Sequence, residues 1–193
     1  MFRELLRQRV GGTASLTSQQ LRALEGHYQL LVQWNRVLNL TSIEDVAEVV
    51  ERHYCESVFL AVHLPAGALR LADLGSGGGF PGVPLAILRP DCSVTLVESH
   101  RRKAVFLREA CRGLANVRVL PTRFEDVTEG PFDRLVSRAV SYKDLKPALR
   151  KLGHAADLLT GEETPPAELG LVWDAPILLP WGRGRFLRSG VFT

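Results

Sequence analysis

Apolar residues recur at intervals of three and four along the first third of the chain, a spacing typical of helices that pack on a core. One such run begins after Thr17, a residue type favoured just before a helix, and ends between residues 35 and 39. A second run starts at residues 41–42 and stops before residue 65. The pattern predicts a helical N-terminal extension over residues 1–64.

From residue 68 short apolar runs alternate with helical ones. Such alternation indicates a doubly wound α/β fold, in which helices cover both faces of a mostly parallel sheet. In the tail, segments 171–173 with 177–179 and segment 185–192 predict an antiparallel hairpin at the sheet edge. The other expected elements are strands 68–74, 93–98, 116–120, 132–136 and 155–160, and helices 82–89, 99–112 and 141–152.

A turn made almost wholly of glycine joins the first expected strand to the helix that follows it. It reads Gly75-Ser76-Gly77-Gly78-Gly79-Phe80-Pro81-Gly82. Because glycine loses much conformational entropy on ordering, an ordered turn of this composition indicates positive φ angles or close approach to a ligand. Proline at the helix start favours order over a flexible linker. The turn therefore predicts a nucleotide cofactor at the helix N-terminus.

The residues of the turn favour S-adenosylmethionine over a nicotinamide dinucleotide. The dinucleotide fingerprint counted from Gly75 requires a small residue where Phe80 stands. Counted from Gly77, it meets Pro81, which lacks the amide donor that a pyrophosphate would use. Asp73 ends an apolar strand, a costly place for a carboxylate unless it meets amide donors or a cationic ligand. S-adenosylmethionine is cationic and has no phosphate.

Two further acids follow the next strands. Glu98 ends strand 93–98, where such folds bind ribose hydroxyls. Glu125 follows strand 116–120, where an adenine amino group would lie, with Phe124 beside it to cover the ring. Residues 65–193 are therefore interpreted as a Rossmann-like S-adenosylmethionine-binding methyltransferase domain. A non-catalytic or dinucleotide-binding module is the alternative.

Composition narrows the class of protein further. Hydrophobic residues make up 46% of the 193 residues, yet no window approaches the roughly 20 apolar residues of a membrane helix. The first residues contain no apolar stretch of signal-peptide type, so we expect a cytoplasmic protein without membrane contact. Cys55, Cys92 and Cys111 are widely spaced and lack CxxC or His-rich neighbours, which predicts reduced packing residues and no metal site.

Positive charge is clustered rather than large, since the formal net charge is only +3. Residues 101–112 on one expected helix hold five basic side chains, and a second basic group lies between residues 134 and 151. If both groups share a face, they form a platform suited to phosphate backbones. The alternative is two solvated helix faces.

Several sequence blocks in a fixed order resemble those of a known family. They are Gln33–Ser42, Arg52–Ser57, Gly75–Pro90, Glu98–Ser99, Lys103, Phe106–Leu107 and Ser137–Ala139. In these blocks the chain resembles the small-subunit ribosomal RNA methyltransferase G family. The resemblance implies an enzyme that uses S-adenosylmethionine to methylate N7 of one guanine in 16S rRNA, with the small ribosomal subunit as partner. We expect a monomer.

The resemblance also implies site residues. The expected cofactor contacts, including those deduced from the turn and the strand ends, are Asp73, Gly75, Gly77, Gly79, Phe80, Glu98, Phe124, Glu125 and Arg138. Guanine N7 carries a free lone pair, so we expect no acid or base residue, and Arg138 would position the guanine or a phosphate. The expected RNA contacts are His53, Arg101, Arg102, Lys103 and Arg123. For His53, on an expected helix, the alternative is a structural histidine.

One position departs from the family pattern. The family usually has a lysine after the fifth strand, followed by glycine, whereas this chain reads Thr160-Gly161. A lost cation near the target base would weaken phosphate anchoring. The alternative function is a methyltransferase for a small molecule, which would not depend on the basic residues at 101–103.

Overall fold

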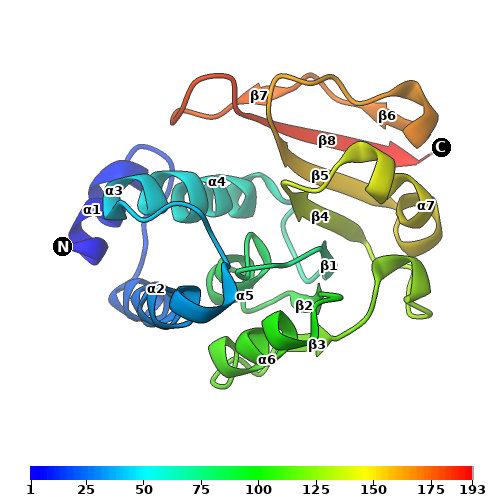
Figure 1. Ribbon diagram of the computed structural model, residues 1–193. Helices are drawn as coiled ribbons and strands as arrows, with labels where there is room; N and C mark the ends of the chain where they lie inside the picture. The colour runs from blue at the N-terminus through cyan, green and yellow to red at the C-terminus, as the bar shows by residue number, and fades with distance from the viewer. Residues whose placement is uncertain (193) are drawn as a thin grey trace.

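The computed structural model describes residues 1–192. An eight-stranded sheet forms its centre, in the order β3-β2-β1-β4-β5-β8-β6 with β7 beside β8 (Figure 1). The strands are β1 (Arg70–Leu74), β2 (Ser93–Val97), β3 (Val117–Leu120), β4 (Arg134–Arg138), β5 (Ala155–Thr160), β6 (Leu171–Trp173), β7 (Ile177–Leu178) and β8 (Phe186–Phe192). The helices are α1 (Phe2–Val10), α2 (Ser18–Leu38), α3 (Val46–Val49), η1 (Val50–Cys55), α4 (Glu56–His63), α5 (Gly82–Leu88), α6 (Arg101–Ala110), η2 (Phe124–Asp126), α7 (Tyr142–Leu152) and η3 (Ala167–Leu169).

The pairing of the strands confirms the predicted fold class. Strands β1 to β5 run parallel, and β8 lies antiparallel to β5, β6 and β7. Strand β8 is therefore the inner strand of the predicted edge hairpin, and β6 and β7 both pair with it. From β1 the sheet extends through β2 and β3 on one side and through β4 and β5 on the other, so the strand order reverses between β1 and β4. The crevice at the carboxyl ends of the strands at such a reversal is the usual ligand site of α/β sheets.

The two faces of the sheet carry separate hydrophobic cores. Because successive strand residues point to opposite faces, Leu71 packs with one core and Ala72 with the other. The first core includes side chains of α1 to α6, and the second includes those of α7 and η3. In Figure 1 the blue and cyan N-terminal helices accordingly lie on one side of the sheet and α7 on the other.

The N-terminal helices follow the predicted pattern with two differences. Thr17 caps α2 as predicted, since its side chain accepts a hydrogen bond from the N–H of Gln20 at 3.1 Å and the Gln20 side chain accepts one from Thr17 N–H. The sequence pattern did not single out α1 as a helix of its own. The second expected helix begins only at Val46, after the Asp45 cap, and contains the π-helical turn η1.

The N-terminal helices and the sheet share one core. Leu21 and Tyr54 from the helices belong to the same hydrophobic cluster as Leu71 and Leu96 from the sheet. The division into residues 1–64 and 65–193 stays a prediction. No helix within residues 1–192 is long and apolar enough to cross a bilayer. The three cysteines are buried and none of them forms a disulfide.

Candidate active site

The glycine turn after β1 is ordered by its backbone. Gly75, Gly77 and Gly79 have φ angles of +77°, +54° and +90°, which side-chain-bearing residues rarely adopt. The N–H groups of Gly75 and Ser76 donate to Val97 O at 3.0 and 3.1 Å, which ties the turn to the end of β2. A Cβ on Gly75 would lie 2.8 Å from the Val140 side chain, so the position has no room for one.

Asp73 lies beneath this turn at the end of β1 and is completely buried. Its Oδ2 accepts a hydrogen bond from Gly82 N–H at 3.1 Å, and a Cβ on Gly82 would lie only 2.6 Å from that oxygen. Its other oxygen, Oδ1, is buried without a hydrogen-bond partner. Burial raises the pKa of Asp73 to about 7. A buried, unsatisfied carboxylate oxygen of this kind suits a ligand that brings a donor or a cation.

Glu98 closes the turn from the side of β2. Its Oε2 accepts from Gly77 N–H at 2.8 Å and its Oε1 accepts from His100 N–H at 2.7 Å. Each carboxylate oxygen can accept more than one hydrogen bond, so Glu98 retains capacity for a ligand hydroxyl.

Two side chains from distant parts of the chain, His53 and Arg138, lie against Phe80 of the turn. The His53 ring lies on the Phe80 ring with centroids 4.7 Å apart, and the Arg138 guanidinium lies 5.3 Å from the Phe80 centroid. Arg138 Nη1 donates to His53 Nδ1 at 2.7 Å and to Arg52 O at 2.9 Å. Burial lowers the pKa of Arg138 to about 10, which leaves it charged at neutral pH. Its Nε is buried without a partner.

The π-helical turn η1 brings His53 to this position. A π turn disrupts the regular helical hydrogen-bond ladder, and such turns are frequent at functional sites. Because Nδ1 of His53 accepts from Arg138, the proton lies on Nε2, which donates to Thr41 Oγ1 at 2.8 Å. Burial, and then the charge of Arg138, lower the pKa of His53 to about 3. His53 is therefore neutral.

An open cavity of about 270 Å³ lies next to the turn, at the ends of β1 and β2. Its lining residues are Gly75, Val97, Ser99, Arg123, Phe124, Glu125, Val140 and Asp144. The structure thus brings Gly75 together with Phe124 and Glu125, which lie some fifty residues further along the chain. At its rim Arg123 Nη2 donates to Glu125 Oε1 at 3.1 Å.

Comparison with known proteins then decides the family. A family model described as rRNA small subunit methyltransferase G matches residues 20–157, which include the glycine turn, His53 and Arg138. The chain belongs to this family.

Its relatives agree with this assignment. Ribosomal RNA small subunit methyltransferase G of Halorhodospira halophila is 44% identical over 128 residues, which cover 65% of this chain and 60% of the relative. The protein of the same name from Chromobacterium violaceum is 45% identical over 129 residues, 65% and 61% of the two chains. The chain thus spans about three fifths of the length of these relatives.

A solved structure shows the shared fold. The crystal structure of a SAM dependent methyltransferase from Aquifex aeolicus superposes with a TM-score of 0.60 at 16% identity. The superposition covers 80% of this chain and 97% of that chain.

The expected RNA contacts of this methyltransferase G family member fall into two groups. Arg101 and Arg102 are exposed and Lys103 is half-buried at the start of α6, which follows Glu98 directly. Arg123 is exposed at the rim of the cavity. His53 differs, because only 3% of it is exposed and both ring nitrogens have partners. In this structure His53 holds Arg138, which fits the alternative of a structural histidine, and its contact with RNA stays a prediction.

Sequence reasoning missed two buried polar groups of this chain, His27 and Glu56. His27 lies under the turn, where Nε2 donates to Gly78 O at 3.0 Å and Nδ1 lies 3.1 Å from the Tyr54 hydroxyl. Glu56 is completely buried, and both of its oxygens accept hydrogen bonds from Arg185 at 3.0 Å. The sequence signal for Glu56 was an acidic residue directly before the apolar residues of α4.

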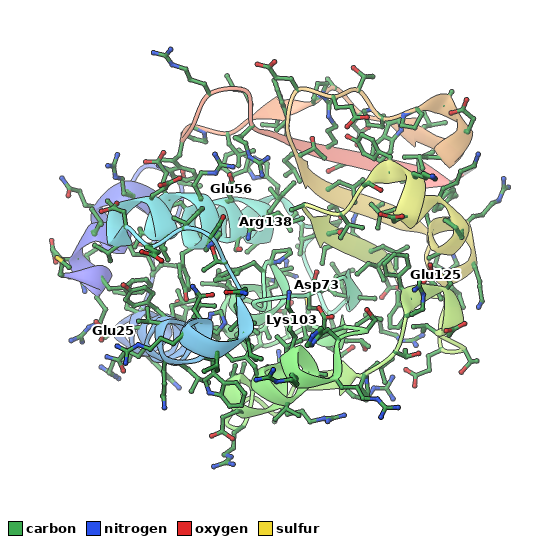
Figure 2. All side chains as sticks on the ribbon, viewed as in Figure 1. Glu25, Glu56, Asp73, Lys103, Glu125 and Arg138 are labelled. Atoms are coloured by element: carbon green, nitrogen blue, oxygen red, sulfur yellow. The ribbon has the colours of Figure 1, made fainter. Side chains whose placement is uncertain are left out.

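Figure 2 shows how these charges are arranged, with the label of Arg138 between those of Glu56 and Asp73. The two carboxyl groups raise the pKa of Arg138, against the lowering effect of burial. Ala139, directly after Arg138, has a φ of +59°, in the left-handed region. This turn leaves Arg138 in contact with the N-terminal helices, while Val140 packs on the opposite core. Among residues 1–192, no group of three His, Cys, Asp or Glu side chains could hold a metal ion.

Proposed function

We propose that the protein transfers a methyl group from S-adenosylmethionine to N7 of a guanine in 16S rRNA of the small ribosomal subunit. Membership of the rRNA small subunit methyltransferase G family gives the class of reaction and substrate. We propose further that the protein works as a monomer in the cytoplasm. The observation that carries the proposal is the unpartnered Asp73 Oδ1, buried beside an ordered glycine turn in a methyltransferase fold.

The residues around the turn fit S-adenosylmethionine. When bound, this cofactor supplies an electrophilic methyl group on a sulfonium. Asp73 would meet its ammonium group, because an ionised carboxylate with a free oxygen needs a cationic donor. Glu98 would accept from the ribose hydroxyls, and the cavity lined by Phe124 and Glu125 would hold the adenine. Arg123 would then share Glu125 with the adenine amino group.

No general base is needed for this reaction, since the N7 lone pair attacks without losing a proton. The buried histidines agree with that chemistry. Burial lowers the pKa of His27 to about 4 and that of His53 to about 3, and both are engaged in hydrogen bonds. Catalysis then consists of aligning N7, the methyl group and the sulfur, and of excluding water.

Arg138 would position the guanine or its phosphate. His53 and the Arg52 carbonyl hold its guanidinium, while Nε has no partner in the protein. An arginine held in one orientation can donate to guanine O6 or to a phosphate oxygen. The cations at 101–103 would attract the RNA backbone from the neighbouring helix.

Transfer of labelled methyl groups tests the proposal. The protein is incubated with labelled S-adenosylmethionine and small ribosomal subunits that lack the modification, and the RNA is digested to nucleosides. We expect label in 7-methylguanosine from 16S rRNA. Absence of label from that nucleoside contradicts the proposal. A free small molecule methylated in preference to the subunits would favour the alternative function.

A further inference from the structure

The loop between α2 and α3 is held by the end of the helix that precedes it. The chain reverses at Asn39, whose φ of +48° lies in the left-handed region that asparagine tolerates. Asn35, near the end of α2, then clamps Thr41. The Asn35 Nδ2 donates to Thr41 O and the Asn35 Oδ1 accepts from Thr41 N–H, both at 2.9 Å. The backbone of Thr41 is therefore fixed relative to α2.

This loop also lies against the glycine turn. A Cβ on Gly78 would lie 3.4 Å from Leu40 O and 3.2 Å from Leu31 Cδ1, so the turn packs closely on both the loop and α2. The position of Thr41, directly after Leu40, is thus set relative to the turn as well.

The Thr41 hydroxyl serves as an acceptor for His53. Its Oγ1 accepts from Ile43 N–H at 3.1 Å and from His53 Nε2–H at 2.8 Å. A hydroxyl oxygen has two lone pairs, and these two donors use both of them. On the other side of the ring, His53 Nδ1 accepts from Arg138 Nη1 at 2.7 Å. A chain of hydrogen bonds therefore runs from Asn35 in α2 through Thr41 and His53 to Arg138.

The direction of these hydrogen bonds is set by both ends of the chain. A guanidinium has donors and no acceptor, so Arg138 binds Nδ1 of His53 only while that nitrogen carries no proton. The proton then lies on Nε2, in a side chain that is almost fully buried, and such a donor needs an acceptor. Thr41 Oγ1 is that acceptor. Without it, the ring either turns or carries its proton on Nδ1, and each change breaks the hydrogen bond to Arg138.

We propose that Asn35 and Thr41 are positioning residues for the methyl transfer, which act through His53 to hold Arg138 in the orientation that aligns the guanine. The inference rests on the proposed function, in which Arg138 contacts the guanine or its phosphate. The cations at 101–103 would still attract the RNA backbone when Arg138 is displaced. Loss of the chain should therefore lower kcat more than it raises KM.

The variant Thr41→Val tests this inference, because valine has nearly the shape of threonine but no hydroxyl. At saturating S-adenosylmethionine and unmodified small subunits, we expect kcat to fall about tenfold while KM changes by about twofold or less. Thr41→Ser keeps the hydroxyl and should retain most of the rate. Thr13→Val makes the same change at another half-buried threonine, after α1, and should leave kcat unchanged. Normal kcat for Thr41→Val with normal wild-type transfer overturns this inference alone.

A double-mutant cycle separates action through Arg138 from a general loss of structure. In an Arg138→Met background, measured by single turnover, Thr41→Val should lower the rate by less than about twofold, because the group that it positions is gone. A fall by the same factor in both backgrounds overturns the inference. Asn35→Ala should lower kcat by a smaller factor than Thr41→Val, since Ile43 N–H still holds the Thr41 hydroxyl. Unchanged kcat for Asn35→Ala overturns the role of that residue.

The ring nitrogens of His53 give a readout that does not depend on methylation. NMR of these nitrogens should show the proton on Nε2 in the wild type and in Thr41→Ser. In Thr41→Val the Nδ1 signal should move, because that nitrogen loses the Arg138 donor. A signal that stays in place overturns the inference whether or not any RNA is methylated. Absence of 7-methylguanosine from the wild-type reaction overturns the proposed function instead.

Discussion

The two sides of the candidate active site are held together by different means. On the side of β1 and β2, the residues that shape the site lie between Asp73 and Glu98, and backbone N–H groups of the turn fix them by hydrogen bonds to Val97 O and to the two carboxylates. On the side of β4 and β5, the ion pair of Glu56 and Arg185 spans 129 positions of the chain. The first side depends on glycine conformation and the second on long-range packing. The N-terminal helices therefore help to hold this side of the site in place.

The ion pair at Glu56 should give the largest effect on stability. Glu56→Ala leaves Arg185 without its buried partner, and breaking a buried pair on one side costs about 3–5 kcal/mol. Urea unfolding measures this loss. Glu4→Ala, at an exposed pair with Arg7, should change the free energy of unfolding by about 0.5 kcal/mol or less. Similar values for the two variants would show that the second side does not depend on this pair.

Asp73 should make the stability and the ligand affinity of the first side depend on pH. Burial raises the pKa of its carboxyl from 3.8 to about 7. Between these values the folded protein holds a proton that the unfolded chain has released. Without ligand, the free energy of unfolding should thus fall as pH rises from about 4 to about 7, by up to roughly 1.4 kcal/mol per unit.

Binding of S-adenosylmethionine should tighten over pH 6 to 8, because its ammonium favours the ionised carboxylate. Asp73→Asn should remove both the stability slope and this change in affinity, whereas the exposed control Asp174→Asn should keep them. Calorimetric titration and denaturant curves at several pH values measure the two effects. If the free energy of unfolding of Asp73→Asn still falls over this pH range, another titratable group causes that dependence.

Gly75→Ala tests the backbone of the first side. The left-handed φ costs a residue with a Cβ about 1–2 kcal/mol, and that Cβ would meet Val140 at 2.8 Å. We expect this loss of stability together with weaker binding of S-adenosylmethionine by about tenfold, since the displaced turn borders the cavity. Gly113→Ala, where an added Cβ meets nothing within 4 Å, is the control and should bind normally.

Removal of the positive charges at the start of α6 should have the smallest effect, and this effect should be confined to RNA binding. Replacing Arg101, Arg102 and Lys103 by glutamine should weaken binding to small subunits and flatten its dependence on salt, by roughly 0.7–0.9 in log–log slope per lost phosphate contact. The same change at Arg3, Arg7 and Arg9 on α1 removes equal charge and should leave the slope unchanged. Equal slopes for the two triple variants would place the RNA elsewhere.

The first side could be predicted from the sequence because its signals are local. The glycine turn, Asp73 and Glu98 lie close together, and Thr17 caps α2 through a residue three positions away. Contacts between residues that lie far apart in the sequence leave no such local signal. The ion pair of Glu56, the neutral state of His53 and the π-helical turn depend on where distant segments meet, and the apolar spacing of the second helix does not reveal its π turn.

The left-handed alanine between Arg138 and Val140 bears on how this site can change. Ala139 adopts a conformation that glycine would occupy without steric cost. Its methyl group makes the peptide on either side less free to rotate than glycine would, so the guanidinium of one neighbour and the isopropyl group of the other stay in fixed relation. Glycine at this position would relieve the steric strain but would leave the relation between the two neighbours less fixed.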